Sequence, residues 1–277
     1  DAIAVRHSPR TRAFLMIGGS AMLALQPGDA HLIGLLTELG DDLVAKLADC
    51  ERTGWRWFEP ELAYDNGRLP EALLRAGLAL DRNDFVIRGL ETLTWLAEQQ
   101  TAKAGHYRPI GSDSFGRAYA PPLAFDQQPL EAWAMIDACD AAFAATGEHH
   151  WQSLGVRVYQ WFLGNNDLGL PIADPVTGEC CDGLMPTGLN RNQGAESVLA
   201  FHMATVMINR LMTDVARKVE YASGGAARLS LRTGDGEAPL TKLDGQQHIL
   251  TPIKALFKAG IGMNVSHVSP HAAKVLA

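Results

Sequence analysis

The sequence predicts an all-α fold in which helical hairpins are arranged as an α/α toroid. Three observations lead to this prediction. Apolar residues recur at helical spacing through most of residues 1–221. Helices with a charged face alternate with helices that are more uniformly apolar. A short polar motif recurs three times along the chain.

The helical periodicity is clearest in residues 29–49. Apolar residues there are spaced three or four positions apart, as on one face of a helix, and they are Leu32, Leu35, Leu36, Leu39, Leu43 and Leu47. Similar spacing in six other segments predicts seven helices in all, over 12–25, 29–49, 68–80, 83–100, 128–145, 149–163 and 193–212.

The predicted helices alternate in character. The second, fourth and sixth carry a charged face, which favours an outer position. Residues 13–25 and 198–212 are apolar nearly all round, so we expect the first and seventh helices to be buried on most sides. Such alternation is typical of two concentric helical layers.

An internal repeat marks the expected starts of three inner helices. Tyr64-Asp65-Asn66 precedes Glu71, Phe125-Asp126-Gln127 precedes Glu131, and Asn192-Gln193 precedes Glu196. The copies are 126 − 65 = 61 and 192 − 126 = 66 residues apart, about one hairpin and a long loop. We therefore expect Asp65, Asp126 and Asn192 to line a common cavity. Residues 222–277 are rich in glycine breakers and are predicted to form a separate irregular tail after the 1–221 domain.

Composition limits the classes of function. Of the 277 residues 47% are hydrophobic, the net charge is −7 and no long basic run occurs, which argues against nucleic acid as a partner. No stretch reaches the roughly 18 uninterrupted apolar residues of a membrane span. The four cysteines form no CxxC pair, which favours a reducing, cytoplasmic compartment. Asp1 is interpreted as a truncated or processed end.

Five motifs carry a resemblance to a known family. They are WRWFEPELAYDNGRLP at 55–70, HYRPIGSD at 106–113, FDQQPLE at 125–131, WFLGNNDLG at 161–169 and NRNQGAE at 190–196. In this order they resemble the helical domain fused to, or encoded beside, bacterial group-1 glycosyltransferases. That domain is similar to the six-hairpin glycosidase and sugar-epimerase toroids. Seven helices are fewer than the twelve of a closed six-hairpin toroid, so an incomplete toroid that self-associates is expected.

The resemblance implies a glycosidase-like domain that acts on or binds a glycan, in the company of a glycosyltransferase. A non-catalytic glycan-binding or accessory module is the first alternative. A sugar epimerase-like enzyme and a helical protein-binding scaffold are the others. No metal-binding motif and no phosphate-binding glycine loop occurs, so neither metal nor cofactor is predicted.

Glycoside hydrolysis requires two carboxylates on opposite sides of the scissile bond. Those near the motifs are Glu59, Glu61, Asp65, Asp113 and Asp126, of which all but Glu61 are taken as catalytic candidates. Aromatic faces and side chains with both donors and acceptors suit sugar recognition. The predicted substrate-binding residues are Trp55, Trp57, Tyr64, Asn66, Arg68, His106, Gln127, Gln128, Asn192, Gln193 and Glu196.

Each of these residues also has a purely structural interpretation. Asp65 and Asp126 stand before predicted helices and could cap them. Arg68 could grip an anionic group of a substrate, or pair with one of the nearby glutamates. Trp55 and Trp57 could pack in the wall of the fold. Epimerisation would require bases such as histidines, and His202, in an apolar helix, is interpreted as a core histidine.

Overall fold

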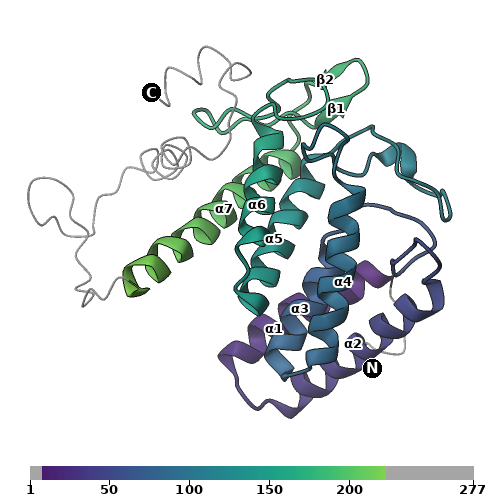
Figure 1. The fold of residues 1–277 in the computed structure, drawn as a ribbon, viewed down its shortest axis with the longest axis vertical. Helices are drawn as coiled ribbons and strands as arrows, with labels where there is room; N and C mark the ends of the chain where they lie inside the picture. The colour runs from purple at the N-terminus through teal and green to yellow at the C-terminus, as the bar shows by residue number, and fades with distance from the viewer. Residues whose placement is uncertain (1–7, 223–277) are drawn as a thin grey trace, which may run out of the picture.

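The protein is all-α, as the sequence predicts. The structure is a computed structural model that describes residues 8–222, with side chains through Met212. Within these residues are seven α-helices, one 3-10 helix and one two-stranded antiparallel sheet (Figure 1). The elements are α1 Pro9–Leu25, α2 Ala30–Cys50, α3 Arg68–Leu80, α4 Asn83–Gln99, η2 Ser112–Ser114, α5 Pro129–Thr146, α6 His149–Phe162, β1 Gly183–Met185, β2 Gly188–Asn190 and α7 Ala195–Ala222.

The helices form three hairpins followed by a single helix. The odd-numbered helices pack in a row, α1 against α3, α3 against α5 and α5 against α7. The even-numbered helices pack against this row: α2 against α1 and α3, α4 mainly against α3, and α6 against α5 and α7. We call the odd-numbered helices the inner row and the even-numbered helices the outer helices; the predicted closure of these helices into a toroid stays a prediction.

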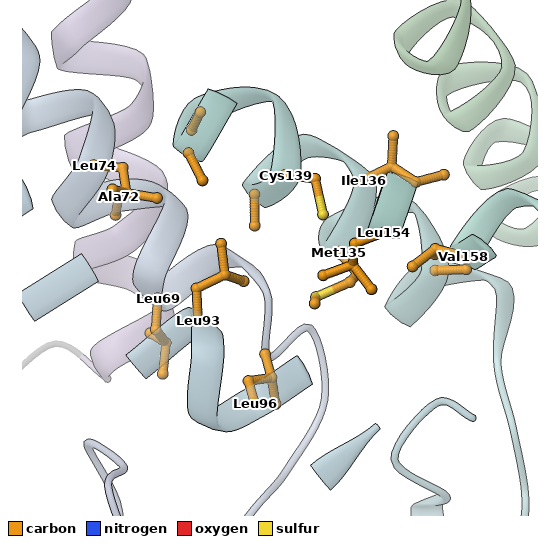
Figure 2. Close-up of a cluster of buried hydrophobic side chains, with 14 of the residues drawn as sticks. Leu69, Ala72, Leu74, Leu93, Leu96, Met135, Ile136, Cys139, Leu154 and Val158 are labelled. Atoms are coloured by element: carbon orange, nitrogen blue, oxygen red, sulfur yellow. The ribbon is translucent and has the colours of Figure 1, made fainter. Parts of the chain in front are cut away.

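The core lies between the inner row and the outer helices. Figure 2 shows part of it, where α3, α4, α5 and α6 meet. Its side chains include Leu69, Leu74, Leu93, Met135 and Val158, all buried. Cys139 lies among them on α5 and is a free thiol, which packs there as a small hydrophobic side chain.

Short turns and long loops alternate along the chain. The turns within hairpins cover only 26–29, 81–82 and 147–148, whereas the segments before α3, α5 and α7 cover 51–67, 100–128 and 163–194. Contacts between these segments place the starts of the inner helices at one end. Arg10 at the start of α1 donates to the Tyr64 carbonyl, and Glu131 at the start of α5 accepts from the Asp65 backbone N–H. The long loops therefore share one end of the molecule.

The expected burial of the first and seventh helices is wrong. Large apolar side chains are exposed on both, and they are Phe14, Leu15, Met22 and Leu25 on α1 and Leu199, Met203 and Val206 on α7. The reason is positional, because α1 and α7 are the ends of the inner row. Each has an inner-helix neighbour on one side only, whereas α3 and α5 have one on both.

The predicted tail, 222–277, lies outside the described residues apart from Ala222, which ends α7. Helix α7 extends beyond the predicted end at residue 212. None of the helices in the described part of the chain is both long enough and apolar enough to cross a membrane.

Candidate functional site

The candidate site lies at the end of the molecule that carries the long loops. We call residues 100–128 and 163–194 the loop layer. Two of its turns are joined by the Ser112 N–H, which donates to the Asp126 carbonyl at 2.9 Å, and by the Asp113 N–H, which donates to the Phe125 carbonyl at 3.1 Å. The backbone of Gln127 pairs with Leu184 in both directions, at 3.0 and 2.9 Å. These contacts bring Asp113, Asp126 and strand β1 together.

Gln127 is the anchor of this arrangement. Its side chain is fully buried. Its amide nitrogen donates to the Asp167 carboxylate at 2.6 Å, and its amide oxygen accepts from the indole N–H of Trp161 at 2.7 Å. Asp167 also receives hydrogen bonds from Arg108 and His106. Burial raises the pKa of Asp167, but these hydrogen bonds outweigh it and the net pKa is lowered.

Asp182 has a comparable structural role at the start of α7. Its carboxylate accepts from the Gly194 N–H at 2.7 Å and from the Asn192 side chain. Partial burial opposes ionisation, but hydrogen bonds from Asn192, Gly194 and Ser197 lower its pKa overall. Asp182 therefore fixes β1 to the first turn of α7 and orients Asn192.

Asp126 differs from these two aspartates because its carboxylate has no hydrogen bond or ion pair within the described residues. Its Oδ1 atom is buried and unpartnered, and it lies against Gly183, where an added Cβ would come within 3.1 Å of it. Burial raises the pKa of Asp126, and the nearby Asp113 carboxylate raises it further. Asp113 itself is exposed. The site thus pairs a carboxyl whose pKa is raised with one that is open to solvent.

A buried ion cluster lies beneath the loops, between α3 and α5. Arg68, which is 4% exposed, pairs with Asp65 at 3.3 Å, Glu71 at 2.7 Å and Asp137 at 2.6 Å. Its guanidinium also lies 4.4 Å from the ring centre of Trp133. The structural alternative for Arg68, pairing with a nearby glutamate, is the one observed. Because its partners occupy it, Arg68 is not available to grip a substrate in this structure.

Glu131 links the start of α5 to the loop before α3. Its carboxylate accepts from the backbone N–H of Asp65 and from the Asn66 side chain, the latter at 3.1 Å. Burial raises the pKa of Glu131 to about 7 and, despite Arg68, that of Asp65 to about 6. Asp65 is 2% exposed and Asn66 is fully buried. These two predicted site residues therefore support the loop and do not line an open cavity beside Asp126.

The capping interpretation of Asp65 and Asp126 is wrong. The N-cap residues of α3 and α5 are Gly67 and Gln128, and neither helix has a side-chain cap. Asp65 has a φ of 55°, in the left-handed region, whereas an N-cap residue usually has an extended backbone. Asp126 stands two residues before the N-cap of α5. Neither carboxylate therefore caps the helix that follows it.

Trp55 and Trp57, which were predicted to bind substrate, belong to the core. Trp57 is fully buried, and its ring stacks on Trp95 with centroids 5.8 Å apart. Trp55 packs edge-on against Trp95 at 5.2 Å and donates to the Glu59 carbonyl. Both tryptophans therefore pack within the fold, which was the structural interpretation of these residues. Tyr64, 49% exposed, keeps a face open to solvent.

The remaining predicted residues divide between paired and open side chains. Glu59 is half-buried and pairs with Arg10, and His106 is held by Asp167. Gln128 is half-buried, whereas Asn192, Gln193 and Glu196 are exposed around the start of α7. The interpretation of His202 as a core histidine is wrong, because its side chain is exposed on α7.

In the described residues, no group of three or more His, Cys, Asp or Glu side chains is arranged to hold a metal ion. All four cysteines are free thiols, and burial raises the pKa of Cys180 to about 12. Asn166 follows α6, and its side-chain amide donates to the Trp161 and Leu170 carbonyls.

No family model matches the chain, and no curated protein matches it. Sequence reasoning missed Asp167, whose partners lie 40 to 61 residues away, and Asp182, whose partners Asn192 and Gly194 lie 10 and 12 residues away. Asp167 lies within one of the five motifs, WFLGNNDLG, which is the signal that could have found it. Asp182 lies outside all five motifs.

Proposed function

We propose that residues 8–222 form part of an α/α toroid whose loop layer binds a carbohydrate. Support for the toroid comes from the row of inner helices, the outer helices packed against it, and the long loops gathered at one end. Such loops would surround the entrance to the inner helices. Four free cysteines fit the proposed cytoplasmic location.

We further propose a glycosidase-like reaction in which Asp126 and Asp113 act together. The observation that carries this proposal is the unpartnered Asp126 carboxyl, held on a braced loop with a second carboxylate as its charged neighbour. A raised pKa suits Asp126 to protonate the leaving-group oxygen. The solvent-open Asp113 would act as the general base or nucleophile. Asp65 and Glu59, already paired with arginines, would support the fold.

Sugar hydroxyls need partners that both donate and accept hydrogen bonds. Gln128, Asn192 and Gln193 offer such amides at the same end of the molecule, and the exposed ring of Tyr64 offers an apolar face. An epimerase would need free bases, whereas His106 is held by Asp167. A glycan made by a neighbouring glycosyltransferase is the ligand class that the resemblance implies.

A glycan array with the purified chain tests binding, and hydrogen exchange with a bound glycan locates it. We expect amide protection in 111–128 and 182–194. The chain offers an internal comparison in the groove of about 640 Å³ between α4 and α6, lined by Ala97, Trp151 and Leu154 among others. Protection confined to that groove would contradict the proposed site. Absence of any glycan binding would contradict the proposed function.

A further inference from the structure

We infer that the groove between α4 and α6 binds a small oxyanion, a carboxylate or a phosphate group, carried on a molecule with an apolar body. The groove lies on other elements than the loop layer, so the inference does not depend on the proposed function. It starts from Arg157 on α6, which lines the groove and has no partner for its charge within residues 8–212.

The groove owes its space to short side chains on α4. Thr94, Ala97, Glu98 and Thr101 are spaced as on one side of a helix, and three of these four are small. They leave an opening of about 640 Å³, within the roughly 300–1,000 Å³ of small-molecule sites. Leu154 on α6 and Ala97 give the groove an apolar lining that suits the body of such a ligand.

Arg157 is unusual among the arginines that are withdrawn from solvent. It is half-buried, and its Nε atom is buried without a hydrogen-bond partner. Six other buried or half-buried arginines pair with a carboxylate, and they are Arg10, Arg12, Arg68, Arg75, Arg82 and Arg108. Arg117, also half-buried, donates to the Pro121 carbonyl at 2.9 Å. A guanidinium partly removed from water without any such contact is unfavourable, so the position of Arg157 favours an anionic ligand.

The floor of the groove also lacks hydrogen-bond acceptors. Trp151 is 3% exposed, and its indole N–H has no acceptor in the described structure. Among the residues that line the groove, the buried side-chain atoms without a partner are this nitrogen and the Arg157 Nε atom, and both are donors. A ligand that complements the groove must therefore bring acceptors. Oxyanions meet this need best, because a carboxylate or phosphate can accept two hydrogen bonds at once from a guanidinium.

Glu98 is the carboxylate nearest to providing the missing charge. It lines the same groove, but it is exposed and forms no ion pair with Arg157 in the described structure. If Glu98 is a bystander, it repels an anion bound at Arg157, and Glu98→Gln should strengthen that binding by roughly twofold. If Glu98 instead swings across to pair with Arg157 in solution, Glu98→Gln should lower stability, and no anion should bind.

Nuclear magnetic resonance titration of the full chain tests the site, with the Arg157 Nε–H signal and the backbone amides of 150–157 as reporters. The probes are sodium hexanoate, which joins a carboxylate to an apolar body, and sodium phosphate. Sodium chloride at equal ionic strength controls for salt. We expect a saturable shift with a dissociation constant on the order of 1 mM. Arg157→Gln should weaken binding at least about tenfold, whereas Arg88→Gln, on an exposed arginine of α4 that pairs with Glu91, should not change it.

The outcomes separate the two oxyanions and the alternatives. Tighter binding of hexanoate supports a carboxylate ligand, and tighter binding of phosphate supports a phosphate group. Equal shifts with chloride, no saturable shift with either probe, or unchanged binding in Arg157→Gln would each overturn the inference. Loss of stability in Glu98→Gln, together with absence of binding, would assign Glu98 as the partner of Arg157. If Arg157→Gln does not fold, Arg157→Lys retains the charge without the paired donors and should still weaken binding.

Discussion

Replacing Gln127 by leucine tests the arrangement that holds Asp126 in place. Leucine has nearly the same volume but cannot form hydrogen bonds. The change removes a donor to the Ala124 carbonyl and to Asp167, and the acceptor for the Trp161 indole. Asp167 keeps Arg108 and His106, so two groups lose their recorded side-chain partner. At about 1–3 kcal/mol for each buried polar group left unpaired, the expected loss is about 3 kcal/mol.

The assay is urea unfolding followed by tryptophan fluorescence, with the slope of the transition checked for constancy. Gln128→Leu is the matched control, because the adjacent Gln128 makes no recorded side-chain hydrogen bond and should change stability by less than about 0.5 kcal/mol. Trp161→Phe should couple to Gln127→Leu by about 1 kcal/mol in a double-mutant cycle. Equal effects of the Gln127 and Gln128 variants would refute the reasoning.

Three further predictions concern packing, pH and association. Gly67→Ala should lower the free energy of unfolding by about 1–3 kcal/mol, because a Cβ there would lie 2.6 Å from the Ala134 backbone. A Cβ at Gly18 would meet nothing within 4 Å, so Gly18→Ala should leave stability to thermal unfolding unchanged or raise it. The folded-state pKa of Glu131 is raised to about 7, so Glu131 contributes to the free energy of unfolding at acidic pH, and this contribution is lost as pH rises from about 4 through 7. The unfolding midpoint should therefore be lower at pH 8 than at pH 5. In Glu131→Gln the difference between the two midpoints should be smaller. An unfolding midpoint that rises between pH 5 and pH 8 would contradict the predicted direction of this pH dependence. Light scattering should show self-association that Met203→Glu weakens, and a monomer that binds no apolar dye would argue against it.

The helices were predictable because their signals are local. The leucine spacing of residues 32–47, and similar apolar spacing in the other segments, define helices within a few residues of those observed, apart from the longer α7. Exposure of the α1 and α7 faces was not predictable from their composition. It depends on which helix ends the row, and that is a property of the tertiary arrangement.

The candidate site was predictable in part. The repeat correctly marked where α3, α5 and α7 begin, and so drew attention to Asp126. It could not separate Asp126 from Asp65, because their local sequences are alike. The difference lies in partners from other segments: Arg68 and the Glu131 carboxylate contact Asp65, whereas no such group from residues 8–212 reaches Asp126.

Release of sugar from a bound glycan, compared between the native chain and Asp126→Asn, tests the central claim most directly. The substitution retains the shape of the side chain and removes no recorded hydrogen bond, so thermal unfolding should change by less than about 0.5 kcal/mol. Turnover should fall by at least about 100-fold, because an amide cannot supply the proton. Asp81→Asn should retain full turnover. A folded Asp126→Asn variant that releases sugar at the native rate would contradict the assignment of Asp126 as the catalytic acid.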